Sequence, residues 1–273
     1  MTLSPNQQLH IYYFEGCIHP ESELLFNDTY IGNWEEDKSS FLFFKKSADH
    51  DISNLKTKQP DLTLIDYFQM SYEELCGGMV LPLDVGPFMI SYPWEKAPDT
   101  HDKISILLDP GVVFGAGTHQ TTYDCLRAID YVCQMHPIDS MMDLGTGTGI
   151  LSIAGARLGI NRIIAVDLNP LAAKTTLNNI KQNQLNKQVV SVQGNALQMI
   201  TQPVDLLIAN IHYEIMSQLI SHPSFLEKKY FILSGLLPSE SQNIFNKLSQ
   251  LPVDILKRWD NHWVTCMGWC NPI

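Results

Sequence analysis

Glycine and acidic residues follow two apolar runs in the middle of the chain, at a spacing that suits the binding of a nucleoside. The segment Met142-Asp-Leu-Gly-Thr-Gly-Thr-Gly149 ends an apolar run in a turn with glycine at alternate positions. Because the Cβ atoms are missing, a nucleoside cofactor can lie directly on the backbone of such a turn. Asp167 follows the next apolar run, where a carboxylate accepts hydrogen bonds from both hydroxyls of a ribose. Capping of the following helix is the competing role for Asp167.

Two asparagines follow later apolar runs in the same way. Asn195 follows the third run within Gly194-Asn-Ala196, and Asn210 ends the fourth run. A ligand of an open α/β sheet lies beyond the carboxyl ends of the strands, so we expect both residues at one site with Asp143. Asn195 is placed to meet an adenine edge, although Gly-Asn is also an ordinary turn pair.

A second glycine-rich segment precedes this set and is suited to closing over a bound cofactor. It reads Asp109-Pro-Gly-Val-Val-Phe-Gly-Ala-Gly-Thr-His-Gln-Thr-Thr122. Together the two segments predict an S-adenosylmethionine-dependent methyltransferase, with the methyl group near Asn210. NAD is the main alternative cofactor, but its turn has the spacing G-x-G-x-x-G/A, whereas Ile150 follows the alternating glycines here. No hydride-transfer site accompanies the turn.

Alternating strands and helices must position these residues. Apolar runs predict strands, and periodic apolar positions with cap residues predict helices. Expected strands are 141–144, 162–166, 189–193, 206–209 and 230–233, the last three central; helices are expected at 150–158, 170–182 and 238–251, and an antiparallel pair at 255–259 and 263–268. Asn169-Pro170 supplies an N-cap and a first-turn proline for the helix to residue 182. The prediction is an α/β protein with a Rossmann-like class I methyltransferase fold, a doubly wound, mostly parallel sheet with a C-terminal antiparallel strand.

The 273 residues exceed the usual size of one domain, so we expect a smaller partner domain. Residues 1–85 are predicted to form a small α+β N-terminal domain that recognises the substrate, with strands at 10–14 and 41–45. The pattern of residues 61–75 fits helix and strand equally well, and residues 81–87 are expected to be a connection. Residues 86–120 would supply linker strands, at 88–92 and 103–108, and the cofactor-closing loop. Residues 121–273 would be the catalytic domain, beginning with a capping box at Thr121 and Asp124.

Composition limits the partners of this protein. The net charge of −11 and pI near 5.2 oppose binding to nucleic acid and favour a basic protein partner. Six cysteines without paired spacing favour reduced thiols over a zinc site or a disulfide framework. No signal peptide or bilayer-spanning run is recognisable, so a cytoplasmic location without membrane binding is expected.

The loop from Asp109 to Thr122 closely resembles that of the ribosomal protein L11 methyltransferases, the PrmA family. The resemblance continues through 143–153, 167–170, 209–211, 233–235 and Trp263, and covers roughly residues 86–268. It implies methylation of lysine and α-amino groups, most directly those of a basic ribosomal protein. No metal is required for this reaction.

The resemblance also implies roles for single residues. Phe114, Gly115 and Thr118 would shape the methionine end of S-adenosylmethionine, and Thr118 and Asn210 would lie at the reactive centre. The remaining cofactor-binding residues would be Asp143, Gly145, Gly147, Asp167 and Asn195. His119 lies in the same loop, where it either takes part in the chemistry or fixes the start of the following helix.

Two departures from the family bear on the acceptor. His212-Tyr213-Glu214 follows Asn210-Ile211, where the family has small or aliphatic residues. The N-terminal region shows no motif match to the family's recognition domain. Its aromatic residues are expected to be mostly core, with a recognition surface as the alternative: Tyr12, Tyr13, Phe14, Trp34, Phe41, Phe43 and Phe44. The open alternatives for function are methylation of another protein or of a small molecule, and a non-catalytic S-adenosylmethionine-binding module.

Overall fold

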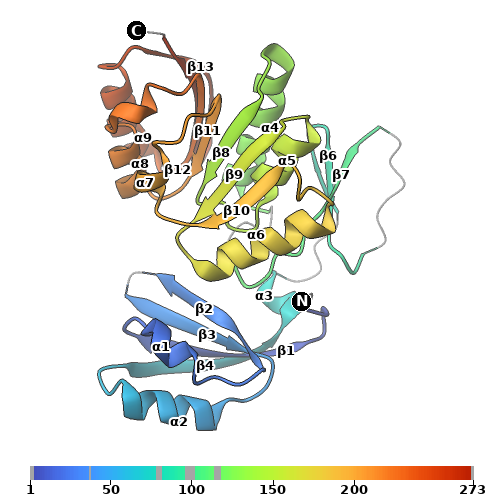
Figure 1. Cartoon of the computed structure of the whole chain (residues 1–273), viewed down its shortest axis with the longest axis vertical. Helices are drawn as coiled ribbons and strands as arrows, with labels where there is room; N and C mark the ends of the chain where they lie inside the picture. The colour runs from blue at the N-terminus through green and yellow to red at the C-terminus, as the bar shows by residue number, and fades with distance from the viewer. Residues whose placement is uncertain (1–2, 37, 78–81, 96–101, 114–117, 272–273) are drawn as a thin grey trace. The chain divides into compact units, whose positions relative to one another are not determined.

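A computed structural model gives the fold and describes residues 3–36, 38–77, 82–95, 102–113 and 118–271. The chain divides into two compact units. The first comprises Met1–Leu81 with Gly111–Val113, and the second comprises Pro82–Pro110 with Phe114–Ile273. Figure 1 labels the elements of both units.

The first unit contains a four-stranded antiparallel sheet, two helices that connect strands and a third, short helix after the last strand. Its elements are β1 (Gln8–Glu15), α1 (Pro20–Glu23), β2 (Tyr30–Glu36), β3 (Ser39–Phe44), α2 (Asp49–Lys58), β4 (Thr63–Ser71) and α3 (Tyr72–Leu75). The strand order β2-β3-β1-β4 is that of the β-α-β-β-α-β ferredoxin-like motif. Ile52 and Leu55 of α2 pack on one face of the sheet, against Tyr12, Phe14 and Phe44.

The ambiguous segment 61–75 forms a strand and then a short helix. β4 pairs antiparallel with β1, and Ser71 starts α3 through a capping box with Glu74. The sequence patterns do not predict β2 or α2. The latter is missed because it buries only Asp51, Ile52 and Leu55 among its ten residues, which is too few to show a helical period.

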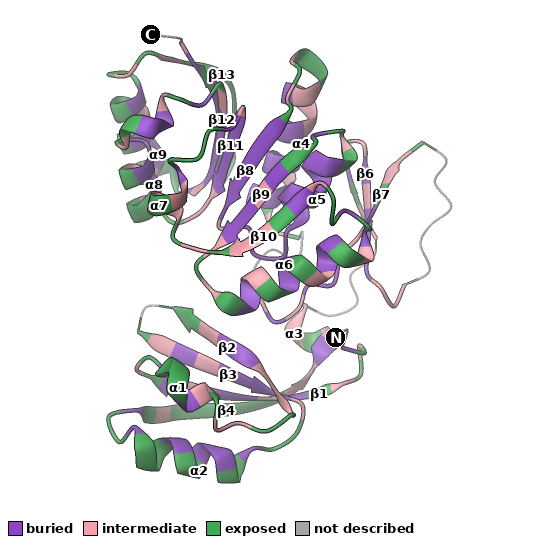
Figure 2. Cartoon of the chain, viewed as in Figure 1, coloured by how far each residue is buried: buried purple, intermediate pink, exposed green. Residues whose placement is uncertain are grey.

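The second unit contains a seven-stranded sheet in the order β10-β9-β8-β11-β12-β14-β13. The parallel strands are β8 (Ser140–Leu144), β9 (Arg162–Asp167), β10 (Val189–Gln193), β11 (Leu206–Asn210) and β12 (Tyr230–Leu236), and the antiparallel pair is β13 (Val253–Asp260) and β14 (Val264–Cys270). This arrangement confirms the predicted Rossmann-like class I methyltransferase fold. The prediction that 189–193 is central is wrong, because β10 is an edge strand with Val190 59% exposed. Figure 2 shows β8 and β11 as the buried centre of the sheet.

Helices cover both faces of this sheet. They are α4 (Gln120–Met135), α5 (Ile150–Arg157), α6 (Pro170–Gln182), α7 (Ala196–Met199), α8 (Tyr213–Leu219), the 3-10 turn η1 (Pro223–Phe225) and α9 (Pro238–Leu248). One hydrophobic cluster joins α4 and α5 to the sheet, and a second joins α8 and α9 to it. The start of α6 agrees with prediction, since Asn169 Oδ1 accepts a hydrogen bond from the Leu171 N–H at 2.8 Å and Pro170 follows the cap.

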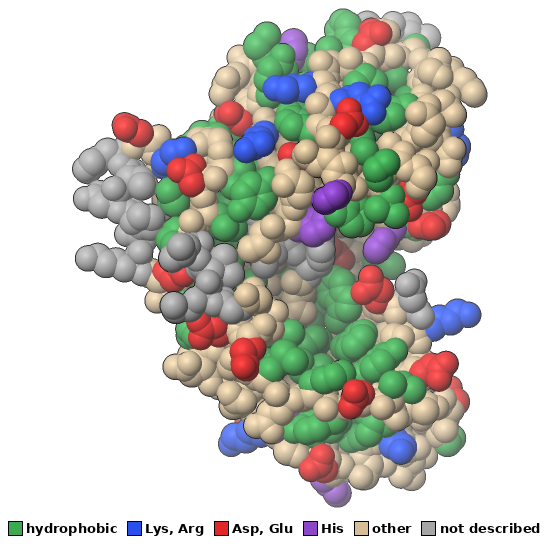
Figure 3. Space-filling view, turned by 180° about the vertical axis from the view of Figure 1, so that it is seen from behind, with side chains coloured by type: hydrophobic (Ala, Val, Ile, Leu, Met, Phe, Trp, Pro, Cys, Tyr) green, Lys and Arg blue, Asp and Glu red, His purple; other side chains and the backbone are tan. Residues whose placement is uncertain are grey.

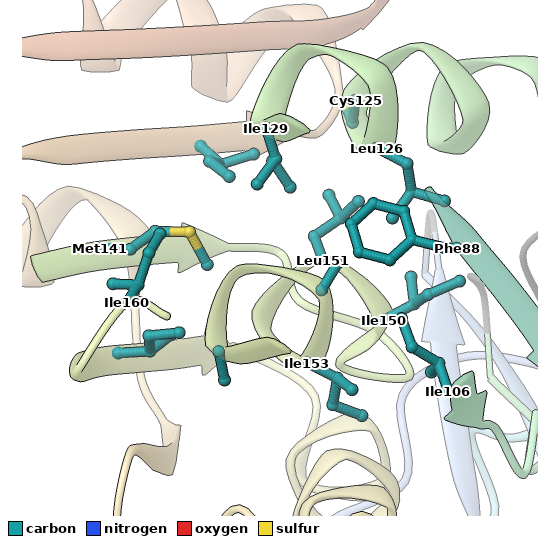
Figure 4. Packing of buried hydrophobic residues seen from close by; sticks show 14 of the residues in the cluster. Phe88, Ile106, Cys125, Leu126, Ile129, Met141, Ile150, Leu151, Ile153 and Ile160 are labelled. Carbon is teal, nitrogen blue, oxygen red and sulfur yellow. The ribbon is translucent and has the colours of Figure 1, made fainter. Parts of the chain in front are cut away.

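A small sheet of β5 (Leu83–Val85), β6 (Phe88–Ser91) and β7 (Ile104–Leu107) also belongs to the second unit. The expected connection at 81–87 therefore contains a strand. Phe88 and Ile106 point into the cluster formed with Leu126 of α4 and Leu151 of α5 (Figure 4). Burial of these side chains fixes β7 on the catalytic unit and so places Asp109, which follows it.

Three further features of the described residues concern cysteines, metal ligands and membrane-spanning helices. None of the six cysteines is part of a disulfide in the structure. Within the described ranges, no group of three or more His, Cys, Asp or Glu residues is placed to hold a metal ion. No helix in that part of the chain is both long and apolar enough to cross a membrane.

Candidate functional site

The glycine turn after β8 has a backbone that only glycine adopts without strain. Gly145, Gly147 and Gly149 have φ values of +72°, +57° and +84°. A Cβ atom on Gly145 would collide with Ile211 of the segment after β11, and one on Gly149 would lie 2.8 Å from Thr176 Cγ2 of α6. Gly145 and Gly147 are predicted to bind the cofactor. At Gly145 and Gly149, close packing of the chain on itself is a sufficient reason.

Asp143 is a fully buried carboxylate at the end of β8. Its Oδ2 accepts hydrogen bonds from Thr146 Oγ1 at 2.6 Å and Ser152 Oγ at 2.8 Å. Its Oδ1 has no hydrogen-bond partner among the residues that the structure describes. Burial raises the pKa of Asp143 to about 6, against the lowering effect of the two hydroxyls. An unpaired buried acceptor is costly unless a ligand satisfies it, and a cationic donor fits a carboxylate best.

Asp167 ends β9, the strand beside β8, and its carboxylate is bonded to the glycine turn. Oδ2 accepts from the Gly147 N–H and Oδ1 from the Asn169 N–H, both at 2.9 Å. Burial raises the pKa of Asp167, and these backbone hydrogen bonds oppose the rise. The cap of α6 is Asn169, which removes the competing capping role for Asp167. Each carboxylate oxygen keeps a further lone pair for a ligand.

The two predicted asparagines lie in different surroundings. Asn210 ends β11, which pairs with β8 on the side opposite β9, so Asp143, Asp167 and Asn210 share one edge of the sheet. Its Nδ2 donates to Thr121 Oγ1 of α4 at 3.3 Å. Asn195 is exposed and caps α7, because its Oδ1 accepts from the Leu197 N–H at 2.8 Å. The turn role that competes with adenine binding is therefore present at Asn195.

The loop before α4 is described in part. Phe114 and Gly115 lie outside the described residues, and Thr118 is exposed beside the start of the helix. The predicted capping box at Thr121 and Asp124 is wrong. His119 caps α4, with Nδ1 accepting from the Thr121 N–H at 3.3 Å. Asp124 instead turns inward and is fully buried.

Two asparagines for which no role is predicted, Asn179 in α6 and Asn183 at its C-cap, hold the end of β7 and the residues after it. Asn179 exchanges hydrogen bonds with the backbone of Asp109, at 2.9 Å as acceptor and 2.8 Å as donor, and also donates to the Thr148 carbonyl at 2.9 Å. Asn183 makes the equivalent pair with the backbone of Leu107. The sequence feature that indicates this role is the spacing of the two asparagines. They lie four residues apart, which places them on one face of the helix next to its apolar positions.

The segment after Asn210 forms the expected mouth for a substrate. Ile211 lies over Gly145, exposed His212 precedes α8, and half-buried Tyr213 and exposed Glu214 form the first turn of that helix. His212 therefore caps, and Tyr213 and Glu214 begin, a helix close in the chain to Asn210.

Comparisons with known proteins agree with this geometry. The family model described as ribosomal protein L11 methyltransferase (PrmA) matches residues 20–269. A curated ribosomal protein L11 methyltransferase of Staphylococcus epidermidis is 33% identical over 234 residues, covering 82% of this chain and 74% of the relative. That of Carboxydothermus hydrogenoformans is 36% identical over 193 residues, covering 69% of this chain and 61% of the relative.

A solved structure is also similar over most of its length. The crystal structure of ribosomal protein L11 methylase from Lactobacillus delbrueckii subsp. bulgaricus has 26% sequence identity and a TM-score of 0.61, covering 68% of this chain and 96% of that one. The resemblance predicted from the loop and the glycine turn is confirmed. With its fold, its family model and its relatives in agreement, this chain belongs to the ribosomal protein L11 methyltransferase (PrmA) family.

Proposed function

We propose that this protein transfers the methyl group of S-adenosylmethionine to lysine or N-terminal amino groups of a basic ribosomal protein. The relatives' names identify ribosomal protein L11 as their substrate, and L11 is the acceptor that we propose here. The observation that carries the proposal is the unpaired Oδ1 of buried Asp143, beside the glycine turn and the Asp167 carboxylate. An amino acid joined to a ribose supplies the matching groups, an ammonium and two hydroxyls.

The residues present fit S-adenosylmethionine along its length. Asp143 Oδ1 would accept from the α-ammonium, which removes the cost of an unsatisfied buried carboxylate oxygen. The N-terminus of α5, which starts after Gly149 in the left-handed conformation, would favour the α-carboxylate. Asp167 would accept from the ribose, Asn195 Nδ2 would meet adenine, and Phe114, Gly115 and Thr118 would enclose the methionine end.

The chain's contribution to the reaction is to bind, orient and desolvate. The cofactor supplies a methyl group on a positively charged sulfur, ready for in-line displacement. Asn210, at the end of β11, would accept a hydrogen bond from the substrate amine and so direct its lone pair, without acting as a strong base. A lysine must be neutral to react, and desolvation at the site lowers the pKa of an amine. The apolar loop residue Phe114 would assist in this.

The N-terminal unit would recognise the substrate. Thirteen of the 29 acidic residues but only five of the 18 lysines and arginines lie before residue 82, which gives this unit −8 of the net charge of −11. Such a field attracts a basic protein.

One face of the unit's sheet offers apolar contacts within this field. Tyr12, Phe14 and Phe44 point to α2, so the alternate residues Tyr13 and Phe41 lie on the other face. These two rings are stacked, with their centroids 4.6 Å apart. Trp34 pairs with Phe41, and 37% exposed Phe68 lies on the same face. Figure 3 shows hydrophobic and acidic side chains together on this unit. Of the aromatic set, Tyr12, Phe14, Phe43 and Phe44 are buried and Tyr13, Trp34 and Phe41 are half-buried, and we assign the half-buried residues to substrate docking.

Labelled S-adenosylmethionine and unmethylated ribosomal protein L11 test the proposed activity. We expect label on lysine or the N-terminal amine, and loss of most turnover with retained cofactor binding in Asn210→Ala. Label on another protein of a cell lysate, with none on L11, would keep the chemistry and reject the substrate. Cofactor binding without transfer to any acceptor would leave the non-catalytic module as the function.

A further inference from the structure

Within the described residues, the hydrogen bond of the Asn210 side-chain amide is made to Thr121, a residue for which the sequence predicts only a capping role. Thr121 is 1% exposed and lies in the first turn of α4, 89 positions before Asn210. Its hydroxyl oxygen accepts from Asn210 Nδ2 at 3.3 Å and lies 2.8 Å from His119 Nδ1.

The neighbouring groups fix the direction of each hydrogen bond. The N–H of Thr121 donates to His119 Nδ1, so this ring nitrogen carries a lone pair rather than a hydrogen. The Thr121 hydroxyl, at 2.8 Å from the same nitrogen, shares this single lone pair with the backbone N–H, so it donates its one hydrogen to His119 Nδ1 and presents its own lone pairs to Asn210. Only the NH₂ end of the Asn210 amide can satisfy them. The reversed amide would place two oxygens in contact without a hydrogen between them.

At the other end of the amide, space is left beside Asn210 Oδ1. Gly235, in β12, has φ +87°, and a Cβ atom there would lie 3.1 Å from Asn210 Oδ1 and 3.0 Å from the Ile211 carbonyl oxygen. The missing side chain keeps space beside Oδ1. With Nδ2 held by Thr121, the acceptor oxygen is the end of the amide that an amine N–H can meet.

The helical turn that carries Thr121 is itself held from the C-terminal hairpin. His119 lies edge-on against Trp263, with ring centroids 5.2 Å apart. Buried Asp124 accepts from Gln120 Nε2 at 3.0 Å and lies 3.5 Å from the donor Asn261 Nδ2. The turn between β13 and β14 thus contacts α4 at two points, on either side of Thr121.

We propose that Thr121 is a positioning residue that sets the orientation of the Asn210 amide, so that its oxygen faces the substrate amine. This rests on the proposed function, because the orientation matters only if Asn210 meets an amine. The chain His119–Thr121–Asn210 is held in place by Trp263 and Asn261 through their contacts with His119 and Asp124.

Thr121→Val removes the hydroxyl at nearly constant volume, and Thr175→Val on α6 is the matched control for a buried helical threonine. We expect kcat to fall at least about tenfold in Thr121→Val, while KM for the protein substrate and the Kd of S-adenosylhomocysteine change by less than about twofold. Thr121→Ser should restore most of the lost turnover. In the Asn210→Ala background, Thr121→Val should cause no further loss. Equal losses in both backgrounds, or a matching loss of cofactor affinity, would overturn the proposal.

A second readout does not depend on turnover. With isotope-labelled asparagine, the side-chain NH₂ signals of Asn210 can be assigned by their loss in Asn210→Ala. They should move in Thr121→Val and in the smaller Thr121→Ala, and stay in place in Thr175→Val. Unmoved signals would refute the positioning role even if the wild-type protein methylates L11. Moved signals in a protein that transfers no methyl group would support the contact and reject the proposed function.

Discussion

At the scale of single residues, the buried carboxylate of Asp143 lowers the stability of the protein when no ligand is bound. A buried carboxylate with one unpaired oxygen disfavours its own ionised form, and this explains the rise of its pKa to about 6. A cationic ligand bound to this carboxylate would offset the free-energy cost of its ionised form. The same residue is therefore expected to lower the stability of the free protein and to raise the affinity for the cofactor.

Asp143→Asn tests this opposition. Because the pKa of Asp143 is raised in the folded state, its full contribution to stability is present below the ordinary value of 3.8 and is lost as the pH rises through about 6. Relative to Asp143→Asn, the wild-type protein should lose up to about 3 kcal/mol of unfolding free energy between about pH 4 and pH 7.5. Urea unfolding at both pH values measures the difference.

The variant should also bind S-adenosylhomocysteine at least about tenfold more weakly, since a charged hydrogen bond is lost. A variant whose stability follows the wild-type protein at every pH would show that Asp143 titrates normally and that its oxygen is not unpaired.

At the scale of elements, the glycine turn is stabilised by its contact with the segment after β11. Gly145 and Gly159 both have positive φ, at +72° and +99°, but a Cβ atom on Gly159 would meet nothing within 4 Å, whereas one on Gly145 would collide with Ile211. Gly159→Ala should therefore cost only about 1–2 kcal/mol of strain. Gly145→Ala should cost clearly more and also displace Ile211 beside Asn210. Thermal unfolding and turnover of both variants check this, and equal losses would contradict the contact.

The sequence predicts the ends of the parallel strands of the second unit to within three residues, because buried runs such as residues 206–209 are uniformly apolar. It places β10 wrongly, since valines at an edge give the same pattern. It misses the cap of α4 because Thr121 and Asp124 match the capping-box spacing, while the choice of His119 depends on Trp263, far along the chain.

The same limit applies to the site. The motifs point to Asp143, Asp167 and Asn210, because these residues lie at the carboxyl ends of strands. They do not reveal the hydrogen bonds of Asn179 to Asp109 or of Asn261 to Asp124, which join residues 70 and 137 positions apart. Such contacts arise only when the sheet order brings the segments together.

At the scale of the whole molecule, the acidic charge is concentrated in the N-terminal unit, and this predicts where the substrate is recognised. On its aromatic face, Asp66 is paired with Tyr13, and Glu15 lies two residues further along β1. Glu15→Lys with Asp66→Lys should raise KM for a basic ribosomal protein several-fold and leave the Kd of S-adenosylhomocysteine unchanged. The control is Glu21→Lys with Asp28→Lys, which makes the same charge change away from this face. An equal rise in both variants would indicate net charge alone, without a defined docking face.

Calorimetric titration with S-adenosylhomocysteine tests the central claim most directly, namely that the carboxyl ends of β8, β9 and β11 bind this cofactor. The account predicts heat with one equivalent bound by the wild-type protein, and an affinity at least about tenfold lower in Asp167→Ala, because its carboxylate would hold the ribose. Absence of heat with both S-adenosylmethionine and S-adenosylhomocysteine, or binding unchanged by Asp167→Ala, would contradict it.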